Sequence, residues 1–273
     1  MMVAFNGGLT EKYGIYSATV IIHITGLVFI GFLTLIKRER PFSKMHAWYL
    51  YLGGVIGVMT TIFNNLSFGR ISVSAILALG LFGQSVTGLI IDQYGLMNMP
   101  RYPFVKRKIL GLLLILCGIV SMISSFQTAA VIASFTAGVT IVVSRTLNAG
   151  LAGRTSVRTS TLYNYMIGLV VSVPVLLILG RNEPSLAVFG FSAEWYIYFG
   201  GILGVCVVLL SNITVMKVSS LYLTLLVFIG QVFSGVLIDV LISKELSYRN
   251  MIGGALVTAG LCVNLLLDRK KTG

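Results

Sequence analysis

The sequence GQSVTGLIID at residues 83–92 recurs as GQVFSGVLID at residues 230–239, and this repeated segment decides the expected fold. The two copies lie within a longer ungapped match of residues 48–92 with residues 195–239, in which 15 of 45 positions are identical. The identities include tryptophan, asparagine, glutamine and aspartate, which shared apolar composition alone would not align. The chain is therefore expected to contain an internal duplication, the feature to be sought first in any sequence.

The match extends beyond this segment on both sides, with small changes of register. Downstream, Gly111 and Gly118 match Gly253 and Gly260. Upstream, the matches run from Asn6, Leu9, Gly26, Leu27 and Val28 to Asn148, Leu151, Gly168, Leu169 and Val170. The sequence thus predicts two repeats, residues 1–126 and residues 127–273.

Composition places both repeats in a lipid environment. The chain is 56% hydrophobic with a mean hydropathy of +0.95, and only 10% of its residues are charged, against about 25% in soluble proteins. A helix needs about 20 apolar residues to cross a bilayer, and continuous apolar runs exclude membrane strands. Nine runs qualify: 16–36, 47–66, 72–93, 109–126, 129–150, 160–180, 194–215, 220–241 and 250–268. The expected fold class is an all-α polytopic membrane protein.

Each repeat is expected to hold five helices, of which the second copy has all five. In the first copy the opening helix would be a stub that ends near Asn6, leaving about nine full helices of a ten-helix plan. We expect that the start codon was placed too late; the alternative is a protein with a true stub. An odd number of helices per repeat inserts the two copies with opposite orientations.

Charge asymmetry predicts the orientation. If successive loops are assigned alternately to the two sides of the membrane, one side has 14 Lys and Arg residues and the other has 5. Arg145 lies inside a helix. The richer face is expected in the cytoplasm, which makes the C-terminus cytoplasmic and the chain a multi-pass protein of the cytoplasmic (inner) membrane. The net charge of +12 is therefore interpreted as a membrane-surface pattern rather than as binding of nucleic acid.

Inverted repeats are typical of secondary transporters, because two similar halves can exchange conformations and expose a central site to each side in turn. The repeated Gly-Gln-x3-Gly-x3-Asp motif, with the glycine-rich helices around it, resembles the YdcZ-like family of the drug/metabolite transporter superfamily. The chain looks like a fused two-repeat form, similar to EamA-like transporters. This resemblance implies a small-molecule carrier with a central cavity and no particular substrate.

Two pairs of polar residues come from the repeated motif. Gln84 and Gln231 are expected near the bilayer midplane, where a buried amide needs a partner. They would line the substrate cavity or tie helices together by hydrogen bonds. Asp92 and Asp239 lie at helix ends, where the helix dipole disfavours a carboxylate. They are interpreted as gating or ion-pair residues, or as structural pairs with nearby arginines.

Four further residues are candidates for substrate binding. Arg145 would bind an anionic group or extend towards the cytoplasmic interface, and Asn148 follows it on the same helix face. His23 has a side chain that titrates near neutrality, or it is simply hydrogen-bonded structure. Tyr165 opens the equivalent helix of the second copy and could instead be an interfacial anchor.

No enzyme motif is present, so no catalytic residue, metal site or cofactor is expected. Cys117, Cys206 and Cys262 are expected as buried small hydrophobic side chains.

The predicted function is that of a secondary transporter, an exporter of small metabolites or drugs that works by alternating access. The alternative is a non-transporting membrane scaffold or regulatory subunit. Solute and lipid bilayer are the expected partners; the substrate, a coupling proton or other ion, and the choice between monomer and homodimer stay open.

Overall fold

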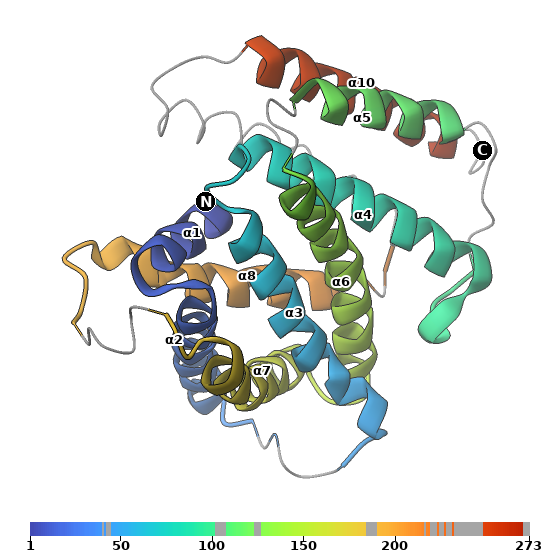
Figure 1. Cartoon of the computed structure of the whole chain (residues 1–273). Helices are drawn as coiled ribbons and strands as arrows, with labels where there is room; N and C mark the ends of the chain where they lie inside the picture. The colour runs from blue at the N-terminus through green and yellow to red at the C-terminus, as the bar shows by residue number, and fades with distance from the viewer. Residues whose placement is uncertain are drawn as a thin grey trace. The chain divides into compact units, whose positions relative to one another are not determined.

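The structure is a computed structural model, and all regular elements among its described residues are helices (Figure 1). It describes residues 1–39, 41, 45–101, 108–122, 127–183, 190–215, 217–218, 223, 227, 231 and 248–269. The α-helices are α1 (Met2–Tyr13), α2 (Ile15–Ile36), α3 (Leu52–Ser67), α4 (Val73–Tyr94), α5 (Lys108–Met122), α6 (Thr128–Ala152), α7 (Val157–Leu179), α8 (Phe199–Thr214) and α10 (Tyr248–Arg269). Short 3-10 helices η1 (Trp48–Tyr51) and η4 (Trp195–Tyr198) precede α3 and α8, and η2 (Leu96–Asn98) follows α4. The predicted run 220–241 lies outside the described residues except for three isolated positions.

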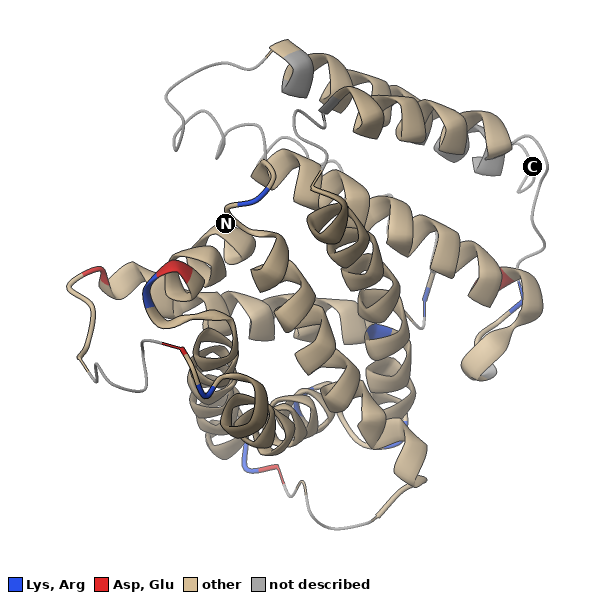
Figure 2. Cartoon of the chain, viewed as in Figure 1, with Lys and Arg blue, Asp and Glu red and all other residues tan. Residues whose placement is uncertain are grey.

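Six of the described helices are long and apolar enough to cross a membrane. Many of their large apolar side chains face outward, including Val28, Phe32 and Leu35 of α2, which are 68, 61 and 78% exposed. Most charged residues fall at helix ends and connections (Figure 2), with Arg145 inside α6 as an exception. An apolar exterior is stable only in lipid, so the chain is an all-α polytopic membrane protein, as predicted.

The chain divides into two compact units that do not follow the predicted repeat boundary. The first unit contains residues Met1–Leu66 and Val143–Lys217, and the second contains Ser67–Val142 and Val218–Gly273. Each unit therefore draws residues from both predicted repeats. Helix α6 belongs to the second unit at its beginning and to the first at its end.

The expected stub is present as α1, a 12-residue helix that is too short to span a bilayer. Contrary to the expectation, it does not end near Asn6 but continues to Tyr13. Gly14 ends it with a φ of 88°, a conformation that glycine adopts without strain. The side chains of Leu9 and Tyr13 pack in one buried cluster with Ile22 of α2 and Ile197 of η4, so α1 is part of the core of the first unit.

Helices α2 and α7 cross in the first unit at two glycines. A Cβ atom at Gly168 would overlap the ring of His23, and one at Gly26 would overlap the ring of Tyr165. The two rings lie 5.8 Å apart between centroids. His23 and Tyr165 are themselves 142 residues apart, as are Gly26 and Gly168. Each ring therefore packs on the glycine of the other helix, and the two contacts are equivalent under the predicted repeat.

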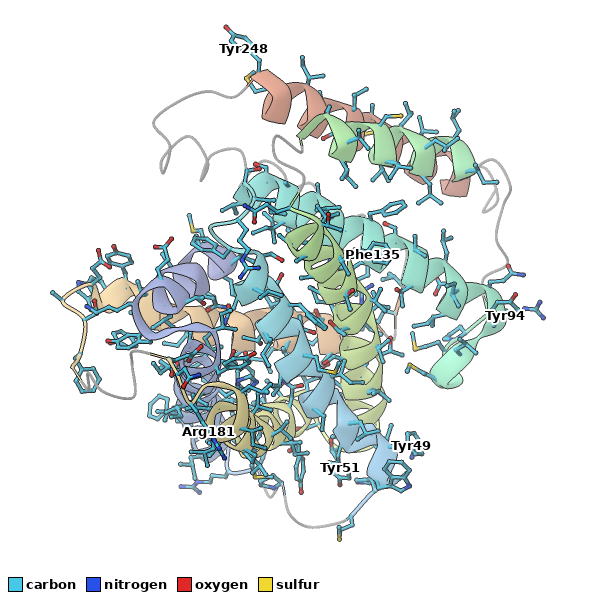
Figure 3. The ribbon with its side chains drawn as sticks, in the orientation of Figure 1. Tyr49, Tyr51, Tyr94, Phe135, Arg181 and Tyr248 are labelled. Carbon is cyan, nitrogen blue, oxygen red and sulfur yellow. The ribbon has the colours of Figure 1, made fainter. Side chains whose placement is uncertain are left out.

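The second unit shows the same kind of paired contact between α5 and α10, which lie side by side (Figure 1). A Cβ atom at Gly118 would lie 2.6 Å from the carbonyl oxygen of Gly253, and one at Gly260 would lie 2.5 Å from that of Gly111. These are the four glycines that the sequence comparison matched. Elsewhere in this unit Phe135 of α6 faces Phe82 of α4 with ring centroids 5.8 Å apart (Figure 3).

Two asparagines each link their helix to another: the Asn65 amide donates to the Thr19 hydroxyl at 3.3 Å, and the Asn212 amide donates to the Thr161 hydroxyl at 3.2 Å. The three cysteines, expected to be buried, are exposed. They lie on apolar helices whose outer faces need no polar groups, and a thiol is apolar enough to stay in lipid.

Candidate functional site

A cluster of buried polar side chains lies in the first unit where α3, α6 and α7 meet. The polar cluster consists of Ser144 and Asn148 of α6 with Ser160 and Asn164 of α7, none more than 8% exposed. The Asn148 amide donates to the Asn164 carbonyl oxygen at 2.8 Å and to the Ser144 hydroxyl at 3.3 Å. The hydroxyls of Ser144 and Ser160 donate to the backbone carbonyls of Gly53 at 2.8 Å and Asn148 at 2.6 Å.

This polar cluster leaves hydrogen-bonding capacity unused. The structure gives the Asn164 amide nitrogen no acceptor among the described residues, and an amide nitrogen can donate twice. Gly53 allows the close approach, because a Cβ atom there would overlap the Asn148 side chain. The cluster is therefore a buried set of donors and acceptors that close helix packing holds in place.

The equivalent positions of the first copy, 142 residues earlier, are mostly apolar. They are Met2, Asn6, Ala18 and Ile22, so only the asparagine is kept. Its side chain packs against Gly200 as Asn148 packs against Gly53, but its oxygen has no hydrogen-bond partner among the described residues. The packing of the two sites is therefore duplicated, whereas the polar chemistry is present at only one of them.

The His23–Tyr165 ring pair adjoins the polar cluster along α7, where Tyr165 follows Asn164, but the Tyr165 ring faces α2 and α8. Both rings are buried, at 3 and 5% exposure. The Nδ1 atom of His23 is 2.7 Å from the carbonyl oxygen of Thr19, and the Tyr165 hydroxyl donates to the carbonyl oxygen of Gly201 at 3.4 Å. The structure thus brings together three predicted site residues, His23, Asn148 and Tyr165, in one unit. The buried position of Tyr165 excludes the interfacial-anchor alternative.

Arg145 precedes Asn148 on α6 and is only 7% exposed. This burial argues against the alternative that its side chain extends to the membrane surface. A buried guanidinium needs compensating partners, and Arg145 does interact within the protein. The equivalent residue of the first copy is Val3, so this charge is a second way in which the two copies differ.

The remaining predicted site residues belong to the second unit. Gln84 and Asp92 of α4 are 4 and 3% exposed, and each makes interactions within the protein. The Oε1 atom of Gln231 is buried without a hydrogen-bond partner among the described residues. Asp239 lies outside the described residues.

The sequence analysis missed a carboxylate at one end of the α2–α7 pair. Glu39, just beyond the end of α2, accepts hydrogen bonds from Ser156 at 2.5 Å and Thr159 at 3.1 Å at the beginning of α7. It also forms an ion pair with Arg158, whose Nε donates at 2.6 Å. Burial of the Glu39 carboxyl opposes its ionisation, but the hydrogen bonds and the charge of Arg158 outweigh burial and hold its pKa below the ordinary value.

Glu183 occupies the corresponding place at the other end of this pair. It lies just beyond the end of α7 and accepts hydrogen bonds from the backbone nitrogens of Tyr16 at 2.9 Å and Ser17 at 3.0 Å. The Ser17 hydroxyl donates to the same carboxylate at 3.0 Å. We call these two contacts the Glu39 clasp and the Glu183 clasp. Together they establish that α2 and α7 run antiparallel.

Within the described residues, no group of three or more His, Cys, Asp or Glu side chains lies close enough to hold a metal ion. The polar cluster consists of amides and hydroxyls, whereas Arg145 and Asp92 are buried residues with ionisable side chains.

The fold and the candidate site define a polytopic helical membrane protein with a polar interior, the class that contains small-solute carriers. A family model described as "Putative inner membrane exporter, YdcZ" matches residues 1–121 and 129–263. The chain belongs to this family, in agreement with the resemblance noted in the sequence, and it is a multi-pass protein of the cell membrane. The family is one of exporters and not of enzymes.

Comparison with solved structures supports the same fold. A chain described only as "Crystal structure of protein" matches with a TM-score of 0.67 and 16% sequence identity, over 100% of this chain and 96% of that one. Among curated proteins, none was found to match the chain.

Proposed function

We propose that this protein is a secondary transporter that exports a small solute across the cytoplasmic membrane by alternating access. The polar cluster of Ser144, Asn148, Ser160 and Asn164 would bind a polar or anionic group of the solute. The His23–Tyr165 ring pair would contact its apolar part, and Arg145 would supply the positive potential for an anionic group. In the second unit, Gln84 and Gln231 would contact the solute, and Asp92 and Asp239 would act in gating.

The antiparallel pairing of α2 and α7, with its duplicated contacts, carries this proposal. Helices at equivalent positions of the two predicted repeats pack on each other through His23–Gly168 and Tyr165–Gly26. This is what two repeats of opposite orientation require. Two halves of similar structure can exchange conformations at little cost in free energy, which is the physical basis of alternating access.

The charge distribution supports an orientation for the first unit. One end of the α2–α7 pair has five basic residues, Lys37, Arg38, Arg154, Arg158 and Lys217, against the single acid Glu39 among its described residues. The other end has Lys12 and Arg181 against Glu11, Glu183 and Glu194. The basic end is proposed to face the cytoplasm, and the C-terminus with it.

Solute flux in proteoliposomes tests the proposal, using panels of cationic, neutral and anionic metabolites with and without a proton gradient. Asn164→Leu and Asn148→Leu are expected to lower flux about ten-fold or more, the effect of losing one hydrogen bond of about 1.4 kcal/mol in the bound state. The matched control is Asn6→Leu, the equivalent asparagine without a polar cluster, which is expected to change flux less than about two-fold.

The outcomes separate the proposal from its rival. Equal loss in Asn6→Leu and Asn148→Leu, with unchanged melting temperatures, would place the site elsewhere. Absence of flux for every panel from folded protein would favour a scaffold or regulatory subunit.

A further inference from the structure

A groove opens in the first unit beside the Glu39 clasp. It has a volume of about 420 Å³ and lies between the last turn of α2, the first turn of α7 and the last turns of α8. Five aliphatic residues and two cations line it: Leu33, Ile36, Val157, Leu209 and Ile213, with Lys37 and Arg158. Ile36 and Ile213 are 57 and 45% exposed on the outer surface of apolar helices, so the groove is open to lipid.

The two cations differ in what they already bind. Arg158 is paired with Glu39, and its side chain remains 40% exposed. The Lys37 ammonium has no hydrogen-bond partner among the described residues, and its backbone nitrogen donates to the Leu33 carbonyl at the end of α2. The acid Glu39 offsets one positive charge, and Arg38, Arg154 and Lys217 add three more at this end of the unit. The groove therefore combines an acyl-chain surface with a net positive rim.

The repeat supplies an internal comparison for this groove. At the other end of the α2–α7 pair, four of the aliphatic positions correspond to Val175, Ile178, Ile62 and Leu66. The cations Lys37 and Arg158 correspond to Leu179 and Tyr16. The apolar surface is thus common to both ends, as helix packing in lipid requires, but the two positive charges are confined to one end. These two charges border an aliphatic groove, and the combination is complementary to an anionic amphiphile.

We propose that this groove binds an anionic phospholipid, with its phosphate between Lys37 and Arg158 and an acyl chain along Leu33, Leu209 and Ile213. Charge complementarity selects the headgroup, because a lysine near a bilayer surface favours anionic over zwitterionic lipid by about five-fold. The aliphatic floor selects a lipid over a free phosphate compound. The lipid lies on the outside of the first unit and does not depend on solute transport.

Native mass spectrometry of the purified protein tests this, with phosphatidylglycerol and phosphatidylcholine titrated separately. Phosphatidylglycerol is expected to bind about five-fold more tightly than phosphatidylcholine. Lys37→Gln is expected to remove this preference, and Lys37→Arg to keep it. The control is Arg38→Gln, the same charge change one residue away from the groove, which is expected to change the preference less than about two-fold. Melting temperatures in phosphatidylcholine nanodiscs check that each variant is folded.

Three results would overturn the proposal. Equal affinity for the two lipids would show that the groove does not select an anionic headgroup. Equal losses in Lys37→Gln and Arg38→Gln would show diffuse attraction to a charged surface. Displacement of the lipid by glycerophosphoglycerol, which has the headgroup without acyl chains, would indicate a site for free phosphate compounds.

Discussion

The two ends of the α2–α7 pair are built alike and charged differently. At each end a carboxylate beyond one helix binds the beginning of the other: Glu39 binds Ser156 and Thr159, and Glu183 binds Tyr16 and Ser17. Only at the Glu39 end does an arginine join the clasp. Features that both ends share are those that helix packing needs, so the features found at one end only are the candidates for function.

The largest expected effect comes from breaking the crossing that both ends share. Gly26→Leu and Gly168→Leu would each force a side chain into a buried ring, and each is expected to lower the free energy of unfolding by about 3 kcal/mol. Melting temperatures in detergent measure this. Gly31→Ala is the control on α2, because nothing lies within 4 Å of its Cβ position, and it should stabilise the helix by up to about 1 kcal/mol. Similar melting of all three variants would contradict this account of the crossing.

A smaller effect distinguishes the two clasps. Glu39→Gln is expected to cost about 2 kcal/mol, since it removes charge-assisted bonds from two hydroxyls and a guanidinium. Glu183→Gln is expected to cost about 1 kcal/mol, since that carboxylate binds the first turn of α2 without a cation. Chemical unfolding in one detergent gives both values. If the two costs were equal, Arg158 would add nothing to its clasp.

A still smaller effect tests the equivalence of the two halves. Asn65→Leu and Asn212→Leu each remove an interhelical hydrogen bond to a threonine, and each is expected to cost about 0.6 kcal/mol. Double-mutant cycles with Thr19→Val and Thr161→Val isolate the two bonds. A coupling energy for only one of the two asparagine–threonine pairs would show that equivalent hydrogen bonds in the two halves do not contribute equally to stability.

The smallest effect is a pH dependence limited to one end. The pKa of Glu39 is held below its ordinary value of 4.5, so the folded state favours the ionised form. This contribution to stability is complete above pH 4.5 and is lost as the pH falls through the lowered pKa. Melting temperatures between pH 7 and pH 3 should fall more steeply at the acid end for the natural protein than for Glu39→Gln. Parallel curves would contradict this assignment.

Much of the fold could be predicted from the sequence because helix length and glycine spacing are local signals. The apolar runs predicted eight of the described α-helices to within a few residues. The matched glycines indicated the duplication, and the structure places Gly118 against Gly253 and Gly260 against Gly111. The offset of 142 residues also relates His23 to Tyr165, so their pairing was available from the repeat. The ring pair itself was not predicted, because the offset relates the two positions without showing that their helices touch.

The clasps could not be predicted in the same way. Glu39 stands among Lys37, Arg38 and Arg40 in a segment that is typical of a membrane stop, and its partners lie 117 to 120 residues away. Glu183 is 144 residues after Glu39, two more than the offset of the flanking helices, so an ungapped comparison does not align them. The polar cluster was predicted only through Asn148, because serines such as Ser144 and Ser160 are common in membrane helices and carry little signal alone.

The clasps also restrict shear between α2 and α7. Sliding one helix along the other by a single residue is a displacement of about 1.5 Å. Because the pair is antiparallel, that displacement would distort the contacts of Glu39 and Glu183 at the same time. Opening one clasp would still leave the register held by the other. Helices α2 and α7 should therefore move together as one rigid body in any conformational change of the first unit.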